Sequence, residues 1–309
     1  MVTGRVRTHL DGMPTALEAF RAAPLQFVDL PSVRIAYRSF GSGPTLVLVH
    51  GWPLSGETYR DLVETLRDDF TCIVPDLPGA GHTAWDDSID ETFTGYAERL
   101  TGFVDALGLQ NFGLIGHDSG GAVARLLAAR MPHRVFGLGL TNTEVPGHVP
   151  TVVRALQIAA HLPGAQWMFG RLVRSRAYLR STFGFAGCFR DLDELHGSFD
   201  ATAVAALRRD TGPAMTVLRK ANLSIPEELD EIHAQIDAPM IAVWGDEDPF
   251  FPYDGAAAMV DSWPHEAVLH RMPGYRLLVH EEAASEVAQL MRPFLLKAAS
   301  EAASRRLSA

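Results

Sequence analysis

The chain has 309 residues, 47% of them hydrophobic, and carries a net charge of −10 at neutral pH. This length allows one large core with an inserted lobe, or two modest domains. The acidic balance argues against a nucleic-acid partner, because binding a phosphate backbone needs a basic face.

Targeting and metal-binding signals are missing from the pattern of the sequence. No apolar run approaches the roughly 20 residues that span a bilayer, and the N-terminus lacks a continuous hydrophobic segment. The two cysteines, Cys72 and Cys188, lie far apart without metal-ligand spacing. We therefore expect a cytoplasmic protein, a monomer or homodimer, with no metal, no cofactor and no membrane partner.

Strand-like runs alternate with amphipathic helical segments, which predicts a mostly parallel sheet with helices on both faces. Residues 1–25 form a leader, with a helix around Ala16–Ala22. Strands are expected at Val33–Tyr37, Thr45–His50, Phe70–Pro75, Phe112–Gly116, Val135–Thr141, Met240–Trp244 and Ala267–Met272. Helices are expected at Tyr59–Leu66, Phe93–Leu107, Ser119–Arg130, Tyr253–Ser262 and Ser285–Leu296.

The alternation stops between about Val145 and Glu231, where the sequence has helical segments and no convincing strand. We interpret residues 146–231 as a helical cap on a core made of residues 26–145 and 232–300. Ligands in open α/β sheets bind outside the carboxyl ends of the strands. A cap at that edge would enclose an apolar cavity for a small-molecule substrate.

The most informative motif is Gly116-His117-Asp118-Ser119-Gly120-Gly121, which lies between an apolar run and an alanine-rich helical segment. A strand that passes through Gly-x-nucleophile-x-Gly into a helix is a nucleophile elbow, although many such junctions are only tight turns. With Asp118 as the nucleophile, Gly116 and Gly120 occupy the two glycine positions of this pattern. With Ser119 as the nucleophile, His117 would occupy the position where the first glycine is needed. An aspartate here predicts attack on an electrophilic carbon through an alkyl-enzyme ester.

Two further motifs end predicted strands. In His50-Gly51-Trp52-Pro53 the backbone N–H of Trp52, together with that of Ser119, is expected to form an anion hole. His50 is expected to brace this loop beside the substrate. In Gly245-Asp246-Glu247-Asp248-Pro249 we choose Asp248 as the carboxylate that orients a histidine, with Asp246 as the alternative.

These motifs, in this order and with a helical insertion, resemble the α/β-hydrolase superfamily, in particular its branch with an aspartate nucleophile. That branch includes epoxide hydrolases, haloalkane dehalogenases and haloacetate dehalogenases. The resemblance covers roughly residues 26 to 297 and implies an α/β-hydrolase fold: a mostly parallel eight-stranded sheet flanked by helices, with an all-helical cap. The HGWP turn is closer to the epoxide-hydrolase form. Dehalogenases commonly have a halide-binding tryptophan where this chain has Ser119.

The resemblance also implies a catalytic histidine after the last strand, and this chain departs from it. Aligning the Glu281-Glu282 pair and Val287 with the family pattern puts Leu277 in the histidine position. Leucine has no proton acceptor, and His280 is the alternative base. Attack by Asp118 needs no base, because a carboxylate is already ionised near neutral pH, but hydrolysis of the ester does. We therefore expect the alkyl-enzyme ester to form but to be hydrolysed slowly, so that turnover is impaired.

In the cap, Tyr178 is a candidate proton donor to an epoxide oxygen and Trp167 a candidate cavity residue. Epoxide hydrolases generally use two cap tyrosines, and this interval has one. The sequence thus predicts a hydrolase acting on a small or medium apolar electrophile, with an epoxide as first choice. The alternatives are a dehalogenase and a ligand-binding or covalent-trapping protein that lacks turnover.

Overall fold

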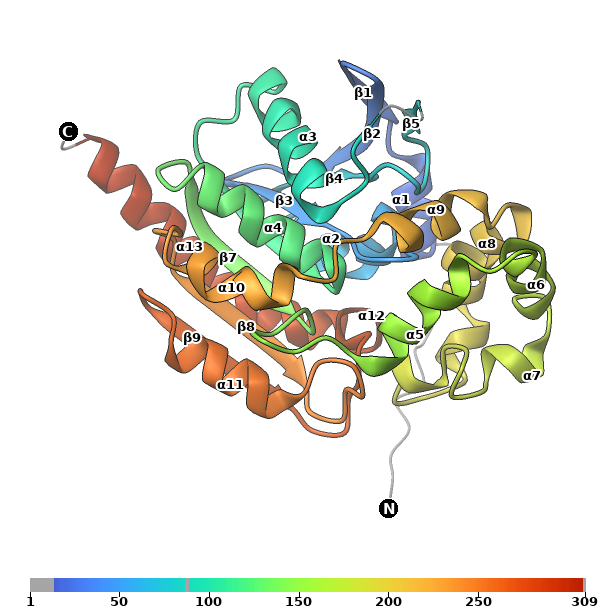
Figure 1. The fold of residues 1–309 in the computed structure, drawn as a ribbon. Coiled ribbons are helices and arrows are strands. Elements are labelled where there is room, and N and C mark those ends of the chain that lie inside the picture. The colour runs from blue at the N-terminus through green and yellow to red at the C-terminus, as the bar shows by residue number, and fades with distance from the viewer. Residues whose placement is uncertain (1–13, 87–88, 308–309) are drawn as a thin grey trace.

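Eight strands form one mixed sheet in the order β1-β2-β4-β3-β6-β7-β8-β9 (Figure 1). The computed structural model describes residues 14–86 and 89–307. The pairs β1–β2 and β2–β4 are antiparallel, and the remaining pairs along this order are parallel. The strands are β1 (Gln26–Leu30), β2 (Val33–Phe40), β3 (Thr45–Val49), β4 (Thr71–Pro75), β6 (Phe112–His117), β7 (Val135–Thr141), β8 (Met240–Gly245) and β9 (Ala267–Met272). A two-residue strand, β5 (Ala84–Trp85), pairs with β2.

Helices cover both faces of the sheet, which is why β6, β7 and β8 are buried along their whole length and read as apolar runs. One face packs against α3 (Phe93–Ala106), α4 (Ser119–Arg130), α10 (Ile225–His233) and α11 (Tyr253–Asp261). The other packs against α1 (Ala16–Ala22), α2 (Arg60–Leu66), α12 (Val279–Glu282) and α13 (Ala284–Leu307). Among the described residues, no helix is both long and apolar enough to cross a membrane.

A group of short helices between β7 and β8 lies beside the sheet, at the right of Figure 1. They are α5 (Thr151–Ala160), α6 (Ala165–Leu172), α7 (Arg176–Leu179), α8 (Ala205–Arg209) and α9 (Gly212–Lys220), with 3-10 turns at Ala186–Cys188 and Glu194–His196 and a π-helical turn at Asp200–Val204. Helix α10, which follows them, packs on α4 and on the sheet. The residue limits drawn for leader, core and cap stay predictions.

All seven strands expected from the sequence are present, and α1 spans the expected residues. Strands β1 and β5 and helices α7 and α10 were not predicted. Strand β1 is an edge strand in which only Val28 is buried, so it has no apolar alternation to detect. Strand β5 is too short to show any period.

The N-terminal helix α1 is part of the core, because Phe20 is buried against Phe40 with the ring centroids 5.0 Å apart. Replacing Phe20 by alanine should lower the free energy of unfolding by about 3 kcal/mol, since it leaves a cavity. Phe27→Ala is the matched control, because that ring is 40% exposed on β1. Equal urea midpoints for the two variants would show that α1 adds nothing to the stability of the fold.

Candidate active site

Asp118 stands at the turn between β6 and α4 with φ 49° and ψ −139°, a strained conformation for a residue other than glycine. Two glycines make the turn possible. A Cβ atom on Gly116 would lie 2.6 Å from the Cα of Gly121, and one on Gly120 would lie 2.2 Å from the carbonyl oxygen of Val49. The chain therefore has the strand–turn–helix geometry that the motif predicts.

The Asp118 side chain is held by the turn that ends β3. The Trp52 N–H donates to Asp118 Oδ2 at 2.9 Å and also lies 3.0 Å from Ser119 Oγ. The backbone N–H of Ser119 likewise stabilises the ionised carboxylate. Asp118 Oδ1 has no hydrogen-bond partner within the described part of the chain. One oxygen is thus fixed by the turn that ends β3, where the anion hole is predicted, and the other is not.

The carboxyl group of Asp118 is enclosed, although the residue as a whole keeps some exposure. Burial, followed by the nearby carboxylate of Glu144, raises the pKa of Asp118 to about 8. The backbone N–H groups of Ser119 and Trp52 lower the pKa of Asp118, but they do not offset the increase that burial and Glu144 cause. Ionisation of Asp118 is therefore shifted towards higher pH than the sequence analysis expects for a carboxylate.

Glu144 is a second acidic residue of the site, and the sequence reasoning missed it. Its carboxylate is buried after β7, with Thr143 Oγ1 at 2.7 Å from Oε2 and the fully buried Arg125 guanidinium at 3.8 Å. The same Thr143 hydroxyl lies 2.7 Å from the carbonyl oxygen of Asp118. Burial raises the pKa of Glu144, and Arg125 opposes this shift. The run of polar residues directly after a buried strand was the sequence signal from which Glu144 could have been identified.

Asp248 follows β8, and its two oxygens are both bound by neutral donors. Asn142 Nδ2 donates to Oδ2 at 2.7 Å, and the Phe250 N–H donates to Oδ1 at 2.8 Å. Asn142 also accepts from the Gly245 N–H at 2.9 Å, so it links the ends of β7 and β8. Burial raises the pKa of Asp248 to about 6. The negative charge of Asp248 in turn raises the pKa of Asp118, so the two carboxyl groups share one site.

Leu277 lies on the loop after β9 and is buried in the apolar core that also contains Val145 and Cys188. The loop is tied to the cap, because the Leu278 N–H donates to the Cys188 carbonyl oxygen at 3.0 Å. The loop also packs closely against Gly245, where the turn that contains Asp248 begins. A Cβ atom on Gly245 would lie 2.4 Å from the Arg276 carbonyl oxygen. The Leu277 side chain thus lies in the apolar core, on a loop that contacts both the cap and the start of the Asp248 turn.

His280 is fully buried away from the site cavity, so its position does not support a role as the base. Its Nε2 lies 2.8 Å from Thr58 Oγ1, and its ring centroid lies 3.9 Å from that of His117. Burial and the positive charge of Arg60 lower the pKa of His280 to about 3. The imidazole belongs to a buried polar cluster with Thr58, Arg60 and Glu281.

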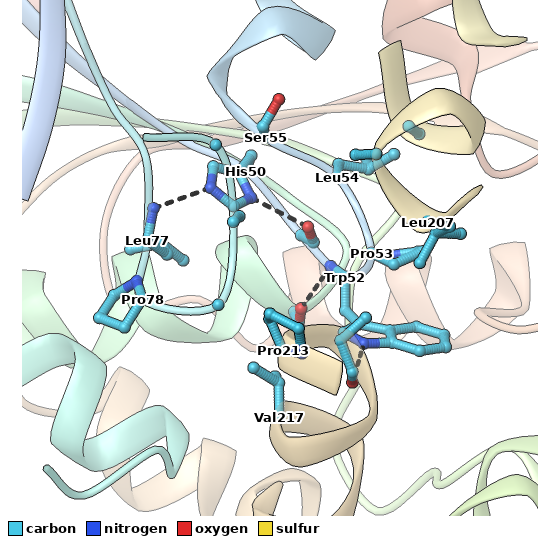
Figure 2. A pocket seen from close by; sticks show the side chains of 18 of the residues that line it. His50, Trp52, Pro53, Leu54, Ser55, Leu77, Pro78, Leu207, Pro213 and Val217 are labelled. Carbon is cyan, nitrogen blue, oxygen red and sulfur yellow. Dashed lines mark hydrogen bonds between the residues drawn. The ribbon is translucent and has the colours of Figure 1, made fainter. Parts of the chain in front are cut away.

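A cavity of about 280 Å³ lies between the loops after β3 and β4 and the cap helices α8 and α9 (Figure 2). Trp52 and Ser119, which both contact the Asp118 carboxylate, line it. His50 braces its wall: its Nε2 accepts from the Leu77 N–H at 2.9 Å, and its Nδ1 lies 3.0 Å from the Gly51 carbonyl oxygen. Within the described residues, no group of three His, Cys, Asp or Glu side chains could hold a metal ion.

Tyr178 and Trp167 line a different space, an apolar cleft of about 520 Å³ within the cap. Neither borders the cavity next to Ser119. Trp52 lines both spaces, and its indole N–H donates to the carbonyl oxygen of Ala214 at 2.8 Å. The sequence had placed all these residues around one cavity, whereas the structure separates the two cap residues from the elbow.

Comparison with known proteins agrees with this architecture, because residues 44–283 match the model of the alpha/beta hydrolase fold family. The chain belongs to the α/β-hydrolase family. It is 25% identical over 265 residues to haloalkane dehalogenase 2 of Mycobacterium bovis, covering 85% of this chain and 92% of that protein. It is 40% identical to the soluble epoxide hydrolase of a Corynebacterium species over 96 residues, 29% of this chain and 32% of that one. The structure of the epoxide hydrolase CorEH superposes with a TM-score of 0.71 at 20% identity, covering 89% of this chain and 99% of the other, which shows the shared fold. The predicted α/β-hydrolase fold is thereby confirmed.

The raised pKa of Asp118 makes the folded protein less stable as pH rises. Between the unfolded pKa of about 4 and the folded pKa of about 8, the unfolded chain releases a proton that the folded chain keeps. Asp118→Asn should therefore stabilise the protein at pH 8 by more than about 1 kcal/mol, with the gain shrinking towards pH 4. Denaturant titrations at several pH values measure this gain.

Asp246→Asn is the control of opposite sign. The side-chain hydrogen bond from Arg271 and the backbone hydrogen bond from Gly274 lower the pKa of Asp246 despite some desolvation. This substitution should therefore destabilise the protein above pH 4. A stability loss in Asp118→Asn that grows with pH would contradict the raised pKa of Asp118.

Proposed function

We propose that this α/β hydrolase uses Asp118 to open an epoxide of small or medium size and apolar character. The observation that carries the proposal is the Asp118 carboxyl group itself, because Oδ2 is held by the Trp52 amide and the two residues that contact this carboxylate, Trp52 and Ser119, line the cavity. Oδ1 attacks a ring carbon, the carbon–oxygen bond breaks, and its electron pair stays on the epoxide oxygen, which takes up a proton. The product of this step is an alkyl ester of Asp118.

Hydrolysis of that ester needs water at its carbonyl carbon. The carbonyl oxygen of the ester would then develop negative charge opposite the amides of Trp52 and Ser119, which supports their role as the anion hole. Collapse of the adduct releases the diol and regenerates the carboxyl group. In this chain no imidazole stands at the position of Leu277 to activate the water, so the second step should be slow.

Two observations favour an epoxide over a haloalkane. A departing halide is an anion that needs N–H donors, and the Trp52 indole N–H is already bound to the Ala214 carbonyl oxygen. Ser119 stands where a further indole would be expected in a dehalogenase. An epoxide oxygen remains attached to the substrate and needs only a proton. A dehalogenase is kept as the second candidate, because the haloalkane dehalogenase relative matches over 85% of this chain.

Tyr178 fits the role of proton donor only for a substrate that extends from the elbow cavity past Trp52 into the cap cleft. Compact substrates should therefore be insensitive to Tyr178→Phe, whereas elongated ones should react more slowly with it. A third reading, a covalent trap without turnover, follows if the ester never hydrolyses at a useful rate.

Incubation with a reactive terminal epoxide should leave a mass adduct on Asp118. Its rate of formation should increase with pH and level off above about 8, because only the ionised carboxylate attacks. Intact-mass spectrometry over time measures the rate, and peptide mapping locates the adduct. Asp118→Asn should give none, and Ser119→Ala should still react. An adduct on Ser119, or none at any pH, would refute the assigned nucleophile. With a haloalkane, halide released in step with the adduct would favour the second candidate.

Leu277→His should supply the missing base, clear the adduct and raise turnover by about 10²–10⁴-fold. Arg276→His is the matched control, because it places an imidazole one residue away and tests the alignment of the loop. Diol release per enzyme, measured by chromatography, follows both variants. Rapid multiple turnover by the unmodified chain, abolished by His280→Ala, would overturn this explanation and make His280 the base.

A further inference from the structure

The outer side of the cap carries an exposed apolar surface around the cleft that Tyr178 also lines. Five of the seven large hydrophobic residues that are exposed in the described chain line the cap cleft. We call these five residues the apolar cap face: Leu156, Leu162, Trp167, Met168 and Phe183. The last four are between 50% and 76% exposed. Contiguous apolar patches of this kind mark interaction sites.

The charge of this region is opposite to that of the whole protein. Residues 146–190 hold six of the chain's 27 basic residues, all arginines, and none of its 37 acidic residues. Arg171, Arg174 and Arg176 are exposed, and none of them has a carboxylate within 4.0 Å in the described structure. Arg171 lies over the ring of Trp167, 5.5 Å from its centroid. Unpaired arginines therefore flank the apolar cap face directly.

We propose that the apolar cap face docks on the surface of an anionic lipid bilayer. Protruding aromatic and aliphatic side chains flanked by arginines are suited to an interface, where apolar groups enter the acyl boundary and cations meet the headgroups. Helices α6 and α7 lie on the side of the cap away from the sheet, at the right of Figure 1, so a flat surface can reach them. The sequence-based expectation of no membrane partner considered only a spanning segment, which surface docking does not need.

The positive charge around the apolar cap face argues against a second copy of the chain as its binding partner. A two-fold dimer would bring the same patch of both copies together, so arginine would face arginine across the interface. Like charges juxtaposed in this way weaken an interface, whereas an anionic surface complements them. The docking proposal does not depend on the reaction proposed for Asp118.

Sedimentation with vesicles tests the proposal. The full chain should bind vesicles of equal parts phosphatidylglycerol and phosphatidylcholine at low salt, should be released as the ionic strength rises, and should not bind pure phosphatidylcholine. The double variant Trp167→Ser, Phe183→Ser should lose binding to the anionic vesicles. Phe27→Ser is the matched control, because Phe27 is the exposed aromatic residue on β1.

The arginines are tested separately. Arg171→Gln together with Arg174→Gln should reduce the partition coefficient on the anionic vesicles by about 25-fold, since each arginine contributes about fivefold. Arg130→Gln is the control, because Arg130 is exposed at the end of α4 without an ion pair. Unchanged melting temperatures exclude unfolding as the cause.

Three results would overturn the proposal. The first is equal binding, or no binding, to both kinds of vesicle. The second is retained binding to anionic vesicles in the Trp167→Ser, Phe183→Ser variant. The third is a dimer in analytical ultracentrifugation that this variant converts to a monomer, which would identify the apolar cap face as a contact between copies.

Discussion

The hydrogen bond from the Trp52 N–H to the Asp118 carboxylate is the interaction on which the site depends. It joins the ends of two adjacent parallel strands, β3 and β6, and forms only because the elbow holds Asp118 at φ 49°. That turn in turn requires the bare backbone of Gly120, which lies against the carbonyl oxygens at the end of β3. The backbone strain at Asp118, the close packing of the strand ends and the orientation of the carboxylate therefore depend on one another.

Polar groups behind the elbow stabilise this arrangement and determine its charge. Thr143 lies within hydrogen-bond distance of both the Asp118 carbonyl oxygen and Glu144, and Asn142 fixes Asp248. Three carboxyl groups thus influence one another in a poorly hydrated space, and Arg125 is the buried cation that balances one of them. Burial raises the pKa values of Asp118, Glu144 and Asp248, and at Asp118 the nearby carboxylates of Glu144 and Asp248 add to this shift.

The elbow could be predicted from sequence because its steric demands select glycine at fixed spacing, and seven strands could be predicted because burial on both faces requires apolar runs. Asn142 and Glu144 were missed because polar residues follow many strands without any role, and only the neighbouring β8 gives Asn142 its partner. The raised pKa of Asp118 depends on enclosure by residues distant in sequence. That Tyr178 and Trp167 line a separate cleft could not be predicted, because the packing of the cap helices, not their sequence, decides which cleft each side chain lines.

In the proposed mechanism, Leu277 and the raised pKa of Asp118 are connected through the residue that a histidine would replace. A histidine between an aspartate nucleophile and Asp248 would take up a proton and favour the ionised forms of both carboxyl groups. In this chain that position lies in the apolar core, and Asp248 is bound by the neutral groups of Asn142 and Phe250 instead. Under the mechanism proposed for Asp118, an imidazole at position 277 would lower the pKa of this carboxyl group and also serve as the base for the ester. A single substitution there would then act on the attack and on the hydrolysis together.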